Sequence, residues 1–348
     1  HPVSLELLAD LGVAEALIAQ GVQVRRGQAL RSLSEPIGAL DFQHLPRPFP
    51  FVLSIPQYRT EAVLERRLRV VDDRALHRGH ELCGLQDLGE RQRLTFRRGD
   101  GAEVQVDADF VVGADGVRST TRELAEIPYE GGPYPDTFLM GDFVDDTELG
   151  PEAAIFLHPE GLVESFPLPD GQRRWVVRVP SAGASTVLGD AGDAELLRQR
   201  IVASVIARVG HDLGRTPCLM QSTFGVQHFL AQRFVQGRVI LAGDAAHVVS
   251  PIGGQGMNLG WKDAARLLEA FEALPERRPW RRALASYARR SRRVAKVATR
   301  RSAFYMRLGR AQRHPGLRDA AIGAILRTPL AHVAARLFTM RGLETIPI

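Results

Sequence analysis

The sequence predicts an α/β fold in which a β-sheet region interrupts a domain of mixed helices and strands, and a helical tail follows. Three observations lead to this prediction. An apolar strand at 238–242 leads into a glycine-rich loop and a helix at 258–274, the strand–loop–helix order of α/β folds. Residues 131–234 alternate between apolar and polar and are divided by turn residues, as in an antiparallel sheet. Beyond Pro279 the apolar spacing is helical to about Met340.

The first part of the chain is expected to contain both kinds of element. Apolar residues at helical spacing predict one helix over 4–20, which Gly21 ends, and a second over 56–68 with Pro56 at its start. Between them, residues 23–51 are proline-rich and alternating, which indicates short strands. Further strands are expected at 81–88, 92–98, 103–106 and 110–112.

The middle and the end of the chain differ in their patterns. A helix is expected at 193–209, and Pro315 and Pro329 are expected to divide the helical tail. The strands expected before that helix are at 134–144, 153–157, 162–168 and 173–179.

Length and composition favour a folded protein of two domains. A chain of 348 residues that is 45% hydrophobic can bury a sizeable core. No stretch reaches the ~20 apolar residues of a membrane span and no leader sequence opens the chain, so we expect a cytoplasmic protein. Cys83 and Cys218 stand alone and the histidines lack ligand spacing, so no metal site is expected.

The positive charge is concentrated in one segment. Residues 275–313 contain thirteen Arg, one Lys and one Glu, a local charge of +13, whereas the whole chain carries +5 and the remainder therefore about −8. The favoured interpretation is a solvated helical face that is rich in Arg through coding bias, because the chain has only two lysines. Membrane-surface contact is a less favoured alternative, and nucleic-acid binding is not expected because no recognised module accompanies the charge.

The glycine-rich loop after residue 242 has the composition of an anion-binding turn. Gly243 allows close approach of the backbone to a ligand, and the carboxylate of Asp244 can accept a hydrogen bond from a ligand hydroxyl. Gly253, Gly254 and Gly256 place backbone N–H groups at a helix N-terminus, where the helix dipole favours negative charge. The competing interpretation is a strand–turn–helix whose glycines serve only tight packing.

The whole loop resembles that of the FAD-dependent aromatic hydroxylases related to p-hydroxybenzoate hydroxylase. The matching pattern is Gly-Asp-Ala-Ala-His from Gly243, then Pro-x-Gly-Gly-Gln-Gly-Met-Asn from Pro251, then Asp-Ala at 263–264. The resemblance implies that Asp244 binds the ribityl chain of FAD and that Pro251 lies beside the reactive edge of the flavin, the one catalytic position assigned. It also implies that the residues after Pro251 bind the cofactor, namely Gly253, Gly254, Gln255, Gly256, Met257 and Asn258.

A second match to this family lies at 113–122. The family's Asp-Gly-x-x-Ser-x-x-Arg element is present from Asp115, after the apolar strand at 110–112. The resemblance implies that Asp115 and Gly116 contribute to FAD and NAD(P)H binding and that Arg122 anchors the segment. Gln57 matches a family glutamine that contacts the cofactor, although taken alone it is as compatible with a helix cap or a solvent-facing side chain.

The chain departs from the family at its start. The family opens with a strand, a Gly-x-Gly-x-x-Gly turn and an acidic residue that bind the adenosine diphosphate part of FAD. This unit is not seen, and the first residue is His1 instead of Met. We therefore expect the natural protein to be longer, and this chain alone to fold or to bind FAD poorly.

The resemblance implies a discontinuous, Rossmann-like FAD-binding domain formed by 1–130 and 236–275, with the strands of 23–51 inserted near the substrate domain. Residues 131–235 correspond to a β-sheet substrate domain and 276–348 to a tail of helices. Phe166, Trp175 and Phe224 are candidates for lining a pocket, but aromatic residues on strands belong more often to the core.

The activity implied is a monooxygenase that uses NAD(P)H, FAD and O2 to hydroxylate a small aromatic compound through a flavin C4a-hydroperoxide. The compound is a phenol, a quinone precursor or a polyketide, a small aromatic or hydrophobic partner, and the oligomeric state stays open. Two alternatives remain: a flavoenzyme of the same fold that carries out epoxidation, isoprenoid reduction or halogenation, or a non-catalytic, truncated remnant.

Overall fold

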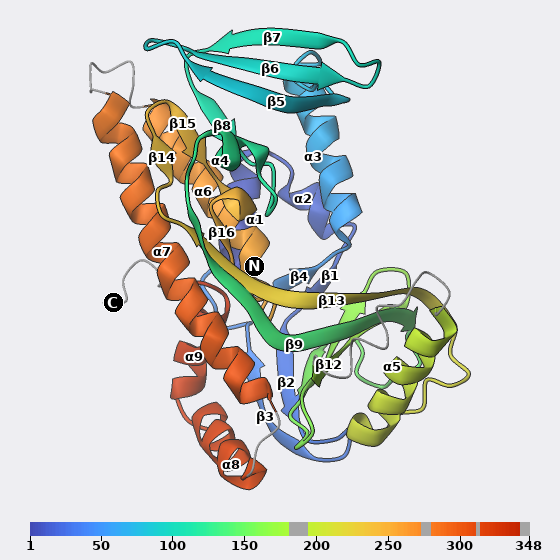
Figure 1. Ribbon diagram of the computed structural model, residues 1–348. Helices are drawn as coiled ribbons and strands as arrows, with labels where there is room; N and C mark the ends of the chain where they lie inside the picture. The colour runs from blue at the N-terminus through green and yellow to red at the C-terminus, as the bar shows by residue number, and fades with distance from the viewer. Residues whose placement is uncertain (181–193, 273–279, 311–313, 342–348) are drawn as a thin grey trace. The chain divides into compact units, whose positions relative to one another are not determined.

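The computed structural model describes residues 1–180, 194–272, 280–310 and 314–341, and confirms the α/β class (Figure 1). The chain divides into two compact units. Unit 1 comprises 1–64, 133–226 and the described residues from Phe304 onward, and unit 2 comprises 65–132 and the described part of 227–303. The expected assignment of chain segments to cofactor and substrate remains a prediction. No helix in the described ranges is both long and apolar enough to cross a membrane.

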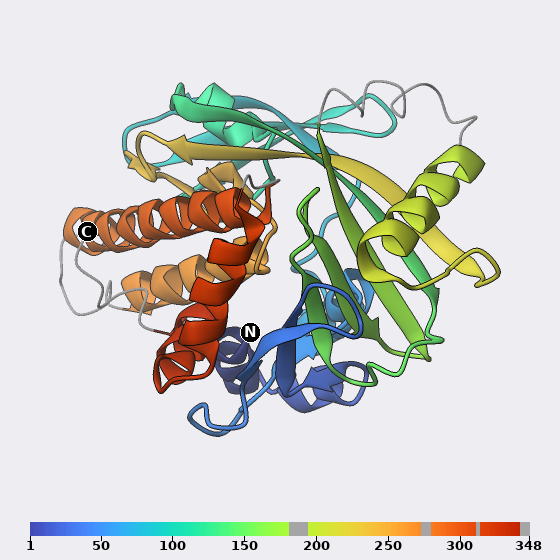
Figure 2. The same cartoon turned by 90° about the horizontal axis from the view of Figure 1, so that it is seen from below.

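Unit 1 is built on a large, mostly antiparallel sheet. Helix α5 (Ala194–Val209) contacts β11 and β12 and covers one face of it (Figure 2). The core between helix and sheet includes Phe143, Trp175 and Ile201, each with no exposed surface. The strands follow the order β13 (Cys218–Ala231), β9 (Tyr129–Val144), β12 (Gln172–Pro180), β11 (Val163–Leu168), β10 (Ala153–Phe156), β2 (Arg26–Leu30) and β3 (Pro36–Asp41).

The expectation of one helix over 4–20 is wrong. Helix α1 (Pro2–Asp10) ends before Gly12, whose φ of +72° is unfavourable for other residues, and α2 (Ala14–Ile18) starts anew. The short strands β1 (Val22–Val24) and β4 (Val52–Ser54) pair antiparallel, as the alternating pattern around them indicates. The division of the tail at the two prolines is confirmed, because α8 (Pro315–Leu326) and α9 (Leu330–Phe338) are separate helices, and both contact β3.

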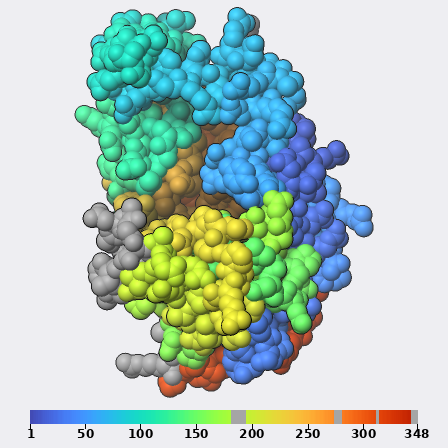
Figure 3. All heavy atoms as spheres, turned by 90° about the vertical axis from the view of Figure 1, so that its right-hand side faces the viewer, coloured from blue at the N-terminus to red at the C-terminus, as the bar shows by residue number. Residues whose placement is uncertain are grey.

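Unit 2 contains two small sheets and the glycine-rich loop. Strands β14 (Val235–Gln236), β15 (Val239–Leu241) and β8 (Val111–Gly113) form one sheet, in which β15 and β8 run parallel. Strands β5 (His80–Asp87), β6 (Gln92–Arg98) and β7 (Glu103–Ala108) form an antiparallel sheet at the molecular surface (Figure 3). The strands expected between 81 and 112 are therefore confirmed.

Helices complete unit 2 around an apolar core. Helix α4 (Thr120–Leu124) follows β8, and α6 (Gln255–Glu272) follows the glycine-rich loop. Ile240 and Leu241 of β15 pack in one cluster with Leu267 of α6 and Leu284 of α7 (Trp280–Gly309). The loop is thus held at the point where a buried strand and two helices meet. Helix α3 (Gln57–Val71) begins in unit 1 and ends in unit 2.

The two isoleucines of α5 provide a test of the core of unit 1. Ile201→Ala should lower the free energy of unfolding by about 2–5 kcal/mol, because the side chain is fully buried and its loss leaves a cavity. Ile206→Ala, on the same helix at 45% exposure, should change it by less than about 1 kcal/mol. Urea unfolding measures both, and equal losses would contradict the packing described.

Candidate functional site

The glycine-rich loop begins where β15 approaches α6. Gly243 has a φ of +59°, and a Cβ built on it would lie 3.9 Å from the Cα of Gly260 in α6. Glycine is therefore required at Gly243 by its backbone conformation, and the close approach of the two segments is a consequence. Residues Gly243–Ala245 form a short turn of 3-10 helix, in which Asp244 is the first polar side chain.

The carboxylate of Asp263 joins the strand end, the loop and the helix. It is 1% exposed, and its Oδ2 accepts a hydrogen bond from the backbone N–H of Gly243 at 3.2 Å and lies 2.6 Å from Nε2 of His247. Its Oδ1 lies 3.7 Å from Arg266, whose guanidinium donates to Ser291 of α7. Asp263 closes the matched sequence pattern, but no role was predicted for it.

The second motif is organised by Asp115. Its carboxylate accepts hydrogen bonds from Oγ of Ser119 at 2.5 Å and from both N and Oγ1 of Thr121 at 2.9 Å. Burial acts to raise the pKa of Asp115, but these hydrogen bonds together outweigh it and leave the pKa below its usual value. Ser119 also caps α4 by accepting from the N–H of Arg122, and Gly116 has a φ of +82° in the turn.

Arg122 and Tyr129 connect the two motifs. The guanidinium of Arg122 is buried, donates to the carbonyl oxygens of Val117 and Ala245, and lies 3.9 Å from the centroid of the Tyr129 ring. The hydroxyl of Tyr129 donates to the carbonyl oxygen of Asp244 at 2.7 Å. Burial raises the pKa of Tyr129, which keeps the phenol neutral and able to donate. The carbonyl groups of Asp244 and Ala245 are thus held by Tyr129 and by Arg122 of the second motif.

The side chain of Asp244 is left available. Among the described residues its carboxylate has no hydrogen-bond partner, and it retains an exposed surface although protein atoms crowd it. This partial desolvation raises the pKa of Asp244, while nearby His247 acts in the opposite direction. A carboxylate in this state gains by accepting a hydrogen bond from a ligand.

The second half of the loop turns into α6. Gly253 and Gly254 have φ values of +81° and +62°, and the N–H of Gly254 donates to the carbonyl oxygen of Pro251 at 2.8 Å. Asn258 donates back to the carbonyl oxygen of Gly254 at 2.6 Å. Gln255 is fully buried, and within the part of the chain that the structure describes neither its amide oxygen nor its nitrogen has a partner.

The remaining residues of the loop differ in exposure. Pro251 and Met257 are exposed, and Gly256 is half-buried at the start of α6. All the predicted site residues except Gln57 lie in unit 2, and Arg122 of the second motif contacts the loop at the carbonyl oxygen of Ala245. Gln57 lies at the start of α3 in unit 1, where it is exposed and donates to Glu61 at 2.8 Å.

Sequence reasoning missed several residues that shape the site. Ser119 and Thr121 stand inside the matched motif, so its spacing could have indicated their hydrogen bonds to Asp115. Nothing in the sequence around Tyr129 indicates its contact with Asp244. Of the aromatic candidates for a pocket, Trp175 belongs to the core against α5. Phe224 stacks on Phe138 with ring centroids 5.7 Å apart.

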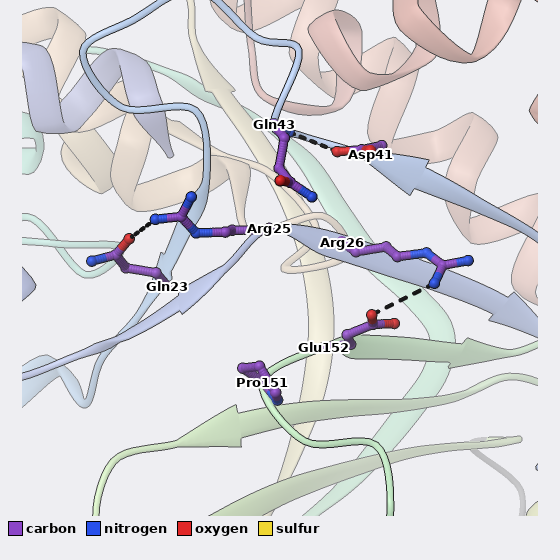
Figure 4. A pocket seen from close by; sticks show the side chains of 7 residues that line it. All are labelled: Gln23, Arg25, Arg26, Asp41, Gln43, Pro151 and Glu152. Atoms are coloured by element: carbon purple, nitrogen blue, oxygen red, sulfur yellow. Dashed lines mark hydrogen bonds and ion pairs between the residues drawn. The ribbon is translucent and has the colours of Figure 1, made fainter.

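Unit 1 carries a pocket that is separate from these residues (Figure 4). Its volume is about 410 Å³, and its polar groups largely satisfy one another: Arg26 pairs with Glu152 at 3.6 Å and Arg25 donates to Gln23 at 2.8 Å. Its lining residues are Gln23, Arg25, Arg26, Asp41, Gln43, Pro151 and Glu152, none of which is a predicted site residue.

Comparison with known proteins places this chain in a family. The model of the FAD binding domain family matches residues 1–302. A 6-methylpretetramide 4-monooxygenase of Streptomyces rimosus is 34% identical over 275 residues, which are 77% of this chain and 47% of that protein. The chain therefore belongs to the FAD binding domain family. It spans about half the length of the curated relatives it matches.

Solved structures agree with this fold. An anhydrotetracycline hydroxylase from Streptomyces rimosus superposes with a TM-score of 0.76 at 27% identity, covering 98% of this chain and 67% of the other. A p-nitrophenol 4-monooxygenase from Pseudomonas putida DLL-E4 gives a TM-score of 0.85 over the whole of this chain and 88% of its own. At 20% identity, the second comparison supports the fold alone.

The contact between Tyr129 and Asp244 can be tested on stability. Tyr129→Phe keeps the ring on Arg122 but removes the hydrogen bond, so the free energy of unfolding should fall by about 1 kcal/mol. Tyr58→Phe is the matched control, because Tyr58 is 65% exposed. Chemical unfolding compares the two variants, and a loss at Tyr129 no larger than at Tyr58 would show that the contact does not hold the loop.

Proposed function

We propose that this chain is the FAD-carrying and substrate-binding part of a monooxygenase that uses NAD(P)H and O2 to hydroxylate a small aromatic compound. One observation carries the proposal: two sequence motifs, more than a hundred residues apart, are joined by Arg122 and Tyr129 around an unpartnered Asp244. Family membership and the names of the relatives, which are hydroxylases and monooxygenases, support it.

The residues present fit the flavin ring and the ribityl chain of FAD. Asp244 offers a free carboxylate for a ribityl hydroxyl, and the buried Gln255 amide offers a donor and an acceptor that nothing else in the described chain satisfies. The N-terminus of α6 offers backbone N–H groups and the positive end of the helix dipole, which would stabilise the negative pyrimidine edge of a reduced flavin. Gly253 and Gly254 keep side chains out of the space beside it.

When bound, FAD would supply the redox chemistry, taking a hydride from NAD(P)H and activating O2. The chain's own residues position it. Asp263 and Tyr129 hold the loop. Asp244 would bind the ribityl chain, and Pro251, which is exposed and has no N–H, would lie beside the reacting edge. We assign Gly256 and Met257 to cofactor binding too, together with the buried Asn258, which donates to the carbonyl oxygen of Gly254. We assign Gln57 to the cofactor as well, by its match to the family's pattern.

The role of Asp115 and Gly116 in this proposal is indirect. The carboxylate of Asp115 is occupied by Ser119 and Thr121, so it acts on cofactor and NAD(P)H binding by shaping the turn before α4. Arg122 then carries that geometry to the carbonyl oxygen of Ala245 and, through the ring of Tyr129, to that of Asp244. We place the protein in the cytoplasm, where NAD(P)H is supplied.

The activity test uses the full-length protein loaded with FAD. NADPH or NADH oxidation is followed with and without O2 and with 2-naphthol as an aromatic probe. The proposal predicts that 2-naphthol accelerates NAD(P)H oxidation, that O2 is consumed, and that the product gains one oxygen atom. Oxidation that proceeds without O2, or that responds to an isoprenoid alkene but not to any phenol, would contradict hydroxylation and favour a reductase or an epoxidase. Failure to bind FAD would favour the remnant.

A further inference from the structure

Glu164 is a carboxyl that the site described above does not use. It lies on β11 of unit 1, between Val163 and Ser165, which have no exposed surface and of which Val163 packs in the core under α5. Because side chains alternate along a strand, Glu164 points to the opposite face of the sheet. There it is only 6% exposed.

The strand register places apolar side chains beside Glu164. It pairs directly with Ile155 of β10 and with Val176 of β12, and Val176 pairs with Met140 of β9. Residues paired across strands share a face of the sheet, so these four side chains form one row. Phe138, two residues before Met140, lies on the same face and stacks on Phe224 of β13 with an interplanar angle of 12°.

Glu164 has no partner in the described part of the chain, either by hydrogen bond or by ion pair. Other charged groups on this face of the sheet bind one another, although Nη1 of Arg178 has no hydrogen-bond partner among the described residues. Arg174 binds Asp142 through two hydrogen bonds of 2.7 and 2.8 Å. Arg178 and Arg310 both bind Asp136. Strands β1 and β4, which contact β11, have no titratable residue.

Burial without compensation has an energetic consequence. It raises the pKa of Glu164 from 4.5 to about 7. A protonated carboxyl still has a donor and an acceptor to satisfy, and an ionised one lacks any counter-charge. Buried polar groups in folded proteins almost always have a partner, so a lone one among apolar side chains suggests a partner supplied by a ligand.

We propose that Glu164 is a substrate-binding residue that accepts a hydrogen bond from a hydroxyl group of the aromatic substrate. This inference rests on the proposed hydroxylase function. It identifies the substrate as an aromatic compound that already carries at least one hydroxyl group. The row of Ile155, Val176 and Met140 would contact its ring.

The experiment measures binding of two probes, 2-naphthol and 2-methoxynaphthalene, to the full-length protein loaded with FAD. The probes share the ring and the oxygen, but only 2-naphthol has a hydroxyl to donate. We expect the wild-type protein to bind 2-naphthol at least about tenfold more tightly, as one hydrogen bond to a charged acceptor provides. In Glu164→Leu this preference should disappear, with little change in the affinity for 2-methoxynaphthalene. The control is Glu195→Leu, on α5 at the other face, which should keep the preference.

A second variant separates recognition from packing. Glu164→Gln keeps the shape and an acceptor oxygen but does not ionise. Affinity of the wild-type protein for 2-naphthol should rise between about pH 6 and about pH 8, around the raised pKa, because the carboxylate is the better acceptor. In Glu164→Gln it should be flat over that interval. This variant also keeps the test decisive if the leucine variant does not fold.

The outcomes distinguish this inference from the proposed function. Equal affinity of the wild-type protein for the two probes, including binding of neither, would overturn the role of Glu164, as would a preference retained in both variants. The proposed function is judged separately, by the flavin absorption bands and the oxygen-dependent oxidation of NAD(P)H. If the flavin bands and the oxygen-dependent oxidation are absent but the preference for 2-naphthol is intact, the hydroxylase function is contradicted and Glu164 remains a binding residue.

Discussion

The buried carboxylate of Asp263 is the interaction on which the geometry of the loop depends. Its contacts reach the backbone of Gly243 at the end of β15, the ring of His247 and, through Arg266, Ser291 of α7. At 1% exposure it has no access to bulk water that would replace a lost partner. The positive φ of Gly243 and the exposed position of Asp244 follow from a strand that must end here and turn toward α6. Tyr129 and Arg122 then fix the same turn from the side of the second motif.

The division of the chain separates two physical tasks. Unit 2 offers backbone N–H groups, glycines and one free carboxylate, which suit a large polar cofactor. Unit 1 offers a sheet with one face closed by α5 and another that carries a lone carboxyl among apolar side chains. Part of the arginine-rich segment is structural: Arg310 binds Asp136, and Arg292 donates to the carbonyl oxygen of Ala231. Some of the arginines in that segment therefore bind acidic or carbonyl groups of the protein itself.

Local sequence signals predicted the parts of the structure that depend on local physics. Periodicity located the strands of unit 2 and the tail helices, and the two prolines marked where the tail divides. Periodicity wrongly predicted a single helix over 4–20, because Gly12, with its positive φ, interrupts the regular apolar spacing. The loop residues were found because they are contiguous in the chain. Tyr129 and Asp263 were not, because their roles arise from contacts with segments 115 and 20 residues away. Glu164 gave no signal either, since an acidic residue on a strand ordinarily faces solvent.

The most direct test of the central claim is the affinity for FAD of the full-length protein and of Asp263→Asn, measured by titration of the flavin absorption and fluorescence. If Asp263 holds the loop for the cofactor, the variant should bind FAD at least about tenfold more weakly, since breaking a buried charged contact costs about 3–5 kcal/mol. Glu269→Gln, on the same helix and exposed, should bind FAD like the wild-type protein. Unchanged affinity in a folded Asp263→Asn variant would contradict the account, because the loop would then keep its form without the carboxylate.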